Sequence, residues 1–89
     1  MNSRTTKRFR QMLAKLPDNI RQQVKGAYRL FTENPHHPSL QFKKIHNTES
    51  IYSVRININY RAVGVIRNGV IVWFWIGPHT EYEKLLDQL

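Results

Sequence analysis

The chain has 89 residues, with 14 Lys or Arg side chains against 6 Asp or Glu, which gives a formal net charge of +8. A chain of this length can form one small hydrophobic core, so multidomain enzymes and nucleotide-binding α/β folds are excluded and residues 1–89 should be one domain. The absence of Cys excludes disulfides and thiolate chemistry. No stretch approaches the roughly 18 apolar residues of a membrane span, and the polar N-terminus is unlike a signal peptide. We therefore expect a soluble, cytoplasmic protein.

The positive charge is concentrated in the first half of the chain. Residues 1–44 hold ten basic and two acidic side chains, whereas residues 45–89 hold four of each. Such a field favours a polyanionic partner, which could be nucleic acid, an anionic membrane surface or an acidic protein. A solvated basic face explains the same charge equally well.

The first third of the chain has the apolar spacing of two amphipathic helices, one over residues 5–16 and one from about residue 18 to Asn34. Pro17 separates them, and Pro35 ends the second. The short connection predicts an antiparallel helical hairpin. The expected core faces consist of Phe9, Met12, Leu13 and Leu16, and of Ile20, Val24, Ala27, Tyr28 and Phe31. A basic stripe along the second helix, which fits solvation or binding, consists of Arg21, Lys25 and Arg29.

After Pro38 the apolar period changes to two, which indicates β-strands. We expect strands from Leu40 to Lys43, over residues 52–59, over residues 61–66 and over residues 70–76. Asn68-Gly69 favours a type I′ hairpin turn between the last two. The last strand is apolar on both sides, which predicts a central strand whose Trp73, Phe74 and Trp75 pack between the sheet and the helices.

A short final helix should follow Gly77-Pro78. Thr80 with Glu83 resembles a capping box for it. The predicted order is ααββββα, with helices and strands segregated, so the fold class is α+β.

Several kinds of active site are excluded by the residues present. The acidic residues are scattered, which argues against paired-carboxylate chemistry, and no Gly-rich phosphate loop exists. His36 and His37 are adjacent in a loop without further ligands, so two polar loop residues explain them better than a metal site. We expect neither a metal nor another cofactor.

Cationic and imidazole side chains remain as candidates for catalysis. Arg55 lies on the polar face of a predicted strand, Arg61 begins the next, and His79 follows the last strand, while Lys43 and Lys44 lie near the end of the first. RNA can be cleaved without a metal when such groups transfer protons and stabilise the phosphorane. Each residue alone is explained as well by a surface or turn position.

Five segments together form a pattern that covers nearly the whole chain: Asn34-Pro35-His36-His37-Pro38-Ser39-Leu40, Phe42-Lys43-Lys44, Tyr52-Ser53-Val54-Arg55, Tyr60-Arg61-Ala62-Val63-Gly64 and Trp75-Ile76-Gly77-Pro78-His79-Thr80-Glu81-Tyr82. A strand that ends in Tyr-Arg and a final strand that ends in Gly-x-His-x-x-Tyr are diagnostic in combination. The pattern resembles the RelE/ParE toxin superfamily, and within it the HigB-like members. The resemblance implies a helical hairpin on a twisted, four-stranded antiparallel sheet with a short C-terminal helix.

The resemblance also implies the toxin of a bacterial type II toxin–antitoxin system. Many relatives are metal-independent endonucleases that cut mRNA on the ribosome and so inhibit translation, which would make the cognate antitoxin, the ribosome and mRNA the partners. By position, Arg61 matches the arginine that stabilises the scissile phosphate, Arg55 matches a cationic position, and His79 matches the general acid/base. Ser53 departs from the pattern, because nuclease relatives often carry lysine there.

The RNA-binding candidates are Lys43, Lys44 and Tyr82, although Tyr82 could equally pack the last helix onto the sheet. Two other functions stay open. One is a gyrase-directed toxin of the ParE branch, which needs no catalytic histidine. The other is a non-catalytic member that binds RNA or an antitoxin, which Ser53 favours.

Overall fold

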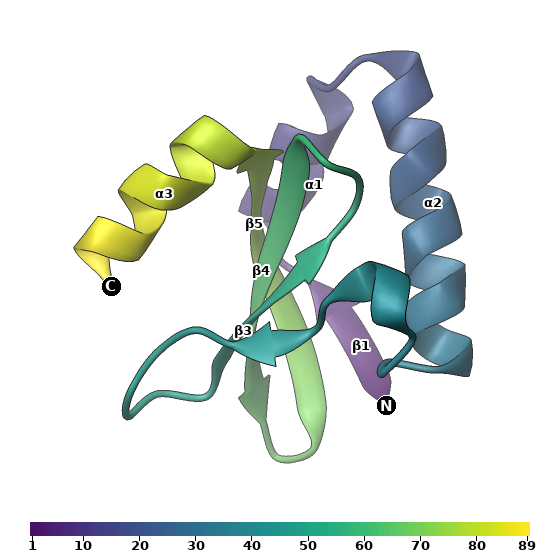
Figure 1. Cartoon of the computed structure of the whole chain (residues 1–89). Helices are drawn as coiled ribbons and strands as arrows, with labels where there is room; N and C mark the ends of the chain where they lie inside the picture. Colours follow the sequence, from purple (N-terminus) through teal and green to yellow (C-terminus); the bar gives the residue numbers. More distant parts are fainter.

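The computed structural model describes all 89 residues as a five-stranded sheet with three helices. The strand order is β1-β5-β4-β3-β2, and α2 and α3 lie on opposite sides of the sheet (Figure 1). The elements are β1 (Asn2–Thr5), α1 (Lys7–Ala14), α2 (Asp18–Glu33), β2 (Lys43–Lys44), β3 (Ile51–Arg55), β4 (Tyr60–Arg67), β5 (Val70–Pro78) and α3 (His79–Gln88), with a short 3-10 turn at Pro38–Leu40. None of the helices is both long and apolar enough to cross a bilayer.

The N-terminal residues form a strand that no apolar alternation predicts. β1 pairs in parallel with β5, from Asn2 opposite Val70 to Thr5 opposite Trp73. The indole Nε1 of Trp73 donates to Ser3 Oγ at 2.8 Å, which fixes β1 by a side chain as well as by its backbone. The α+β class is confirmed, but the sheet is mixed and five-stranded. The strand over residues 70–76 is expected at the centre of the sheet. It corresponds to β5, which is an interior strand, but the middle strand is its neighbour β4.

The first helix begins later than its apolar spacing suggests. Thr6 caps α1, because its Oγ1 accepts a hydrogen bond from the Phe9 backbone N–H at 3.0 Å. The turn of residues 15–17 leads to α2, which runs to Glu33, close to the predicted end.

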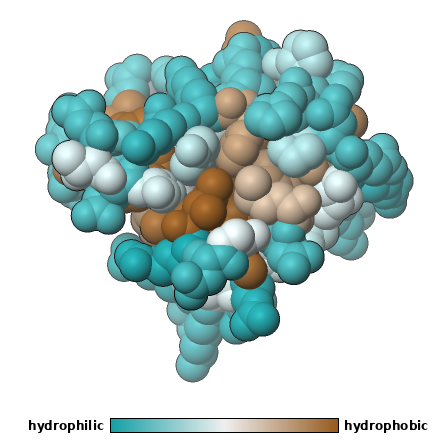
Figure 2. All heavy atoms as spheres, turned by 90° about the horizontal axis from the view of Figure 1, so that it is seen from below, coloured by the Kyte–Doolittle hydropathy of each residue, from teal (hydrophilic) through white to brown (hydrophobic).

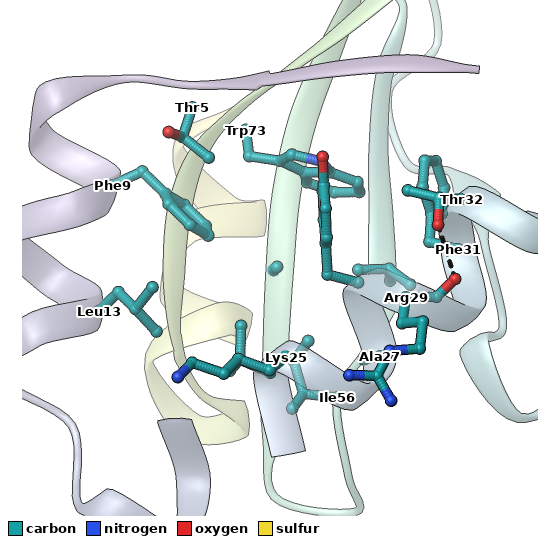
Figure 3. Close-up of a pocket in the computed structure, with 14 residues that line it drawn as sticks. Thr5, Phe9, Leu13, Lys25, Ala27, Arg29, Phe31, Thr32, Ile56 and Trp73 are labelled. Atoms are coloured by element: carbon teal, nitrogen blue, oxygen red, sulfur yellow. Dashed lines mark hydrogen bonds between the residues drawn. The ribbon is translucent and has the colours of Figure 1, made fainter. Parts of the chain in front are cut away.

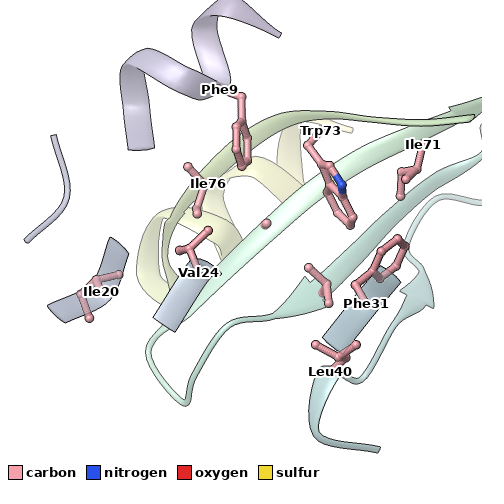
Figure 4. Close-up of a cluster of buried hydrophobic side chains, with 10 residues drawn as sticks. Phe9, Ile20, Val24, Phe31, Leu40, Ile71, Trp73 and Ile76 are labelled. Carbon is pink, nitrogen blue, oxygen red and sulfur yellow. The ribbon is translucent and has the colours of Figure 1, made fainter. Parts of the chain in front are cut away.

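The hydrophobic core lies between the sheet and the pair α1 and α2 (Figure 4). Trp73 is 4% exposed, and its ring and that of Phe31 form a T-shaped pair with 5.4 Å between ring centroids. The buried cluster consists of Phe9, Ile20, Val24, Phe31, Leu40, Val54, Ala62, Ile71, Trp73 and Ile76. Both helices therefore contribute to one cluster, but Tyr28, expected on the core face of α2, is 48% exposed and lies outside it.

A β-bulge in β5 divides the aromatic run. Val63 pairs with Trp75 and Gly64 pairs with Trp73, so Phe74 has no partner on β4. Trp73 enters the core, whereas Trp75 lies near Tyr82 of α3, with 6.3 Å between their ring centroids. Phe74 is only half-buried. Placing the aromatics between the sheet and the helices is therefore correct for Trp73 on the side of α1 and α2 and for Trp75 beside α3, whereas Phe74 is not a core residue.

Gly64 makes room for the buried indole. A Cβ at this position would lie 2.8 Å from Cε3 of Trp73, closer than carbon atoms pack. The close approach of β4 to Trp73 thus requires glycine here.

The ends of several elements differ from the sequence expectation. Leu40 lies in the 3-10 turn, so the first expected strand is reduced to Lys43–Lys44. β3 ends at Arg55 rather than at residue 59, since the Asn57 side chain turns the chain by accepting from the backbone N–H groups of Asn59 and Tyr60 at 2.7 and 2.9 Å. The Asn68-Gly69 hairpin is confirmed, with φ of 53° and 76°.

The start of the last helix also differs. α3 begins directly at His79 with Pro78 as its N-cap, and no side chain caps it. The capping box predicted from Thr80 and Glu83 is therefore wrong.

Candidate functional site

Strand register brings Arg55 and Arg61 together. Arg55 is the last residue of β3 and lies opposite Arg61 of β4, which in turn lies opposite Gly77 of β5. His79 follows two residues after Gly77, at the first position of α3. Its backbone N–H donates to the Asn59 carbonyl at 2.6 Å, which ties the start of α3 to the β3–β4 turn. Three strand ends thus converge on one site.

The Arg61 guanidinium is partly used by the fold. Its Nη1 donates to the carbonyls of Asn57 at 2.7 Å and Tyr60 at 3.0 Å and approaches that of Ile58 at 3.4 Å. Nη2 and Nε have no partner within the chain. They remain free to bind two oxygens of one phosphate, the geometry that guanidinium suits best.

The electrostatics of this site favour an anion. Burial lowers the pKa of Arg61 below its usual value, the neighbouring Arg55 lowers it further, and Tyr82 partly opposes the shift. Neither arginine forms an ion pair with a carboxylate, because the three ion pairs of the chain lie elsewhere. Two adjacent cations without a counter-charge destabilise each other, and a bound phosphate would relieve that repulsion.

His79 is half-exposed and is oriented by a carboxylate. Its Nε2 lies 3.0 Å from Oε1 of Glu83, one helical turn later, and 46% of its side chain is exposed. With Nε2–H donated to Glu83, Nδ1 is the ring nitrogen left for proton transfer, as an acceptor in the neutral ring and as a donor in the imidazolium. The sequence pattern of Thr80 and Glu83 predicts only a capping role for Glu83. The i, i+4 spacing of His79 and Glu83 on a helix was the signal that could have identified the pair.

Tyr82 and Ser53 form a buried pair beneath α3. The Tyr82 hydroxyl donates to Ser53 Oγ at 3.1 Å, and the two residues are 5% and 2% exposed. The Tyr82 hydroxyl therefore already has a partner inside the protein. A contact of Tyr82 with RNA stays a prediction.

The other sequence-derived candidates lie further from the arginines. Lys43 and Lys44 are exposed on the edge strand β2, opposite Ser53 and Tyr52 of β3. His37 has a turn role, because its Nδ1 accepts from the Ser39 backbone N–H at 3.2 Å. No three His, Asp or Glu side chains lie close enough together to hold a metal ion.

An apolar groove of about 560 Å³ lies between α1, α2 and the sheet (Figure 3). Phe9 and Leu13 line it from α1, Trp73 from β5, and Lys25 and Arg29 of the basic stripe from α2. Another view of the surface shows apolar side chains gathered in the middle of one face with hydrophilic ones around them (Figure 2). The two helices thus border this groove instead of packing closely on each other, so the expected helical hairpin is open.

Comparison with known proteins identifies the family. Residues 18–84 match the profile of the ParE-like toxin domain. The chain belongs to this toxin family. No curated protein sequence matches the chain.

Solved structures of such toxins share the fold. A chain of the RelB–RelE antitoxin–toxin complex from Methanococcus jannaschii superposes with a TM-score of 0.73 at 19% identity, over 92% of this chain and 96% of that one. The isolated E. coli RelE toxin gives a TM-score of 0.65 at 18% identity, over 99% and 98%. The YoeB/ParE toxin from Agrobacterium tumefaciens gives 0.69 at 12% identity, over 89% and 99%. The resemblance to the RelE/ParE superfamily is confirmed, whereas the HigB-like subtype stays a prediction.

Proposed function

We propose that this chain is the toxin of a type II toxin–antitoxin pair and that it cleaves mRNA on the ribosome without a metal. The observation that supports this most strongly is the pairing of Arg55 with Arg61, without a carboxylate on either, at strand ends next to His79. Phosphoryl chemistry on RNA needs cations on the phosphate and a group that transfers protons beside them. This site contains both.

In the proposed reaction the 2′-hydroxyl of RNA attacks the adjacent phosphorus and releases its proton to solvent water. Arg55 and the free Nη2 and Nε of Arg61 stabilise the charge on the phosphorane, and His79 donates a proton to the leaving 5′-oxygen. The products are a 2′,3′-cyclic phosphate and a free 5′-hydroxyl. Because Ser53 stands where nuclease relatives often carry lysine, alignment of the 2′-hydroxyl by the ribosome should supply a large share of the rate. Free RNA should be a poor substrate.

The test compares wild type, His79→Ala and Arg55→Ala, with Arg67→Ala as the control. Arg67 is an exposed cation at the far end of β4. We expect His79→Ala and Arg55→Ala each to lower ribosome-dependent cleavage about a hundredfold or more, and Arg67→Ala to leave it unchanged. Arg61→Ala should have the same effect, with a thermal melt to verify folding, because Nη1 of Arg61 holds the β3–β4 turn. If His79→Ala produced as many new mRNA 5′ ends as wild type, that result would contradict the proposal.

The proposed partner is an antitoxin segment that is acidic, partly apolar and disordered until it binds. The RelB–RelE structures of M. jannaschii and E. coli are antitoxin–toxin complexes, and the apolar groove with Lys25 and Arg29 along it offers matching chemistry here. The neighbouring gene product should co-purify with this chain, and raising the salt should weaken the complex. No complex at low salt would count against a toxin–antitoxin pair.

The family match favours a second candidate function, poisoning of DNA gyrase. A gyrase-directed toxin would arrest growth without a catalytic histidine. The discriminating result is toxicity that survives His79→Ala, with inhibited supercoiling and no new mRNA ends. A non-catalytic member is the third alternative, and absence of toxicity from well-expressed wild type would favour it.

A further inference from the structure

A second pocket, of about 410 Å³, lies beside Arg55 between α2 and the β3–β4 turn. We call it the turn pocket. Its apolar lining includes Ala27 and Leu30 of α2 and Ile56 of the turn. Its polar lining includes Gln23, Asn57 and Arg55. The mechanism proposed above uses Arg55 but leaves the rest of this pocket without a role.

A hydrogen bond orients the amide of Gln23 in the turn pocket. Asn57 uses its Oδ1 to accept from the backbone of Asn59 and Tyr60, so its orientation is fixed by the turn. Its Nδ2 then donates to Oε1 of Gln23. The acceptor of Gln23 is thereby occupied, while its amide nitrogen has no partner within the chain. Gln23 is left as an oriented donor.

We propose that the turn pocket binds one nucleobase of the RNA strand whose phosphate lies on Arg55, and that Gln23 reads its edge. This inference rests on the proposed function and adds a source of sequence preference to it. The volume lies within the range of small-molecule pockets, and apolar walls with a few placed polar groups suit a flat heterocycle. The free N–H donor of Gln23 needs an acceptor on the base. Uracil and guanine offer an exocyclic carbonyl oxygen on the pairing edge, whereas adenine offers only ring N1 beside its amino group, so uracil and guanine should bind better.

The apolar groove, which lies on the other side of α2, differs from the turn pocket in the chemistry of its lining. It is lined by aromatic and aliphatic side chains from two helices and the sheet, which suits a protein segment. The turn pocket is smaller, and Arg55 contributes to its lining. The two cavities therefore suit different partners, with α2 between them.

Gly26 allows the turn pocket to be filled without disturbing the core. It lines the pocket, and a Cβ built there meets no atom within 4 Å. Gly26→Leu should therefore occupy the space of the base, while Gly26→Ala leaves most of it open and serves as the matched control. Gln23→Leu keeps the side-chain bulk and removes the donor.

The binding test uses fully 2′-O-methylated RNA hexamers, which cannot be cleaved, identical except for one central base. We expect wild type and Gly26→Ala to bind the uridine and guanosine hexamers more tightly than the adenosine hexamer, and Gly26→Leu to bind every hexamer about tenfold more weakly. Gln23→Leu should bind all hexamers alike. No binding by wild type, equal binding of all bases by wild type, or equal affinity of Gly26→Leu and Gly26→Ala would overturn the proposal.

This test is independent of the cleavage reaction. If wild type binds with the expected preference but produces no new mRNA ends, the nuclease function fails and the base-binding pocket stands. If cleavage depends on His79 but Gly26→Leu binds and cuts like Gly26→Ala, the nuclease function stands and the pocket has no role. Where both hold, Gly26→Leu should also shift the cleavage sites mapped in cells.

Discussion

The buried hydrogen bond between Tyr82 and Ser53 provides a test of how α3 is held on the sheet. It joins residues 29 positions apart in the sequence, and both side chains lie almost entirely inside the protein. Tyr82→Phe removes the donor and little volume. The hydroxyl of Ser53 would then be left in a site that is 2% exposed.

The expected cost follows from what each single change leaves unpaired. A buried polar group that loses its partner costs about 1–3 kcal/mol, so Tyr82→Phe and Ser53→Ala should each lower the free energy of unfolding by about 1–2 kcal/mol. The double variant leaves no orphaned hydroxyl and should cost about 1 kcal/mol less than the sum of the two. Tyr52→Phe is the matched control, because the Tyr52 ring stacks on Phe42 and its hydroxyl has no hydrogen-bond partner.

Urea unfolding followed by tryptophan fluorescence measures all four variants, with the denaturant slope checked for constancy. Strictly additive losses, or a loss for Tyr52→Phe equal to that for Tyr82→Phe, would refute the reasoning. The same variants address the role of Tyr82 in binding. We expect Tyr82→Phe to retain RNA binding while losing stability. Weaker RNA binding with unchanged stability would instead place its hydroxyl on the RNA.

The other predictions concern the core and the arginine pair. Trp73→Ala should lower the unfolding free energy by about 3–5 kcal/mol, because the indole is 4% exposed in the core. Phe74→Ala should cost only about 1–2 kcal/mol, since the bulge leaves that ring half-buried; equal losses would place both rings in the core. Arg55→Ala should raise the pKa of Arg61 towards its usual value and stabilise the fold by a few tenths of a kcal/mol at low salt, with the gain disappearing at high salt. Gly26→Ala should stabilise α2 by up to about 1 kcal/mol, and a lowered melting temperature would show that the Cβ meets an obstacle.

Periodicity identifies most elements of this fold because each of them presents one apolar face to the core. The alternation along β3 and the Asn68-Gly69 pair are local signals, and the structure follows the first as far as Arg55 and the second in full. β1 has no such signal. Its four residues are polar, and it is held by the backbone of β5 and by the indole of Trp73, which lies far away in the sequence. A strand stabilised by distant partners cannot be identified from its own residues.

The bulge at Phe74 limits the sequence reading in another way. Alternation predicts which face a side chain occupies only while the register is regular, and one extra residue reverses the faces that follow. Trp75 consequently lies beside Tyr82 rather than in the core. Nothing in an all-apolar run indicates where such an insertion falls.

The geometry of the candidate site also depends on strand register, which the sequence pattern does not fix. Arg55 and Arg61 can be placed on neighbouring strands from the pattern, but their position directly opposite each other depends on the length of the turn between them. That turn is set by the hydrogen bonds of the Asn57 side chain, which the alternating pattern hides by extending the strand to residue 59.

Asn57 therefore connects the three parts of the proposed site, and substituting it should affect all of them. Its side chain shapes the turn and orients Gln23, and its carbonyl accepts from Arg61 at 2.7 Å. Asn57→Ala removes two backbone contacts and should lower the unfolding free energy by about 1–3 kcal/mol. Asn57→Asp keeps an acceptor for both backbone N–H groups, so its stability loss should be smaller, but it places a negative charge beside the arginine pair and removes the donor to Gln23. RNA affinity should thus fall more for Asn57→Asp than for Asn57→Ala, the reverse of the order in stability. Urea unfolding and RNA titration measure the two quantities. If Asn57→Ala lowers both the unfolding free energy and the RNA affinity more than Asn57→Asp does, the turn acts on RNA only through folding.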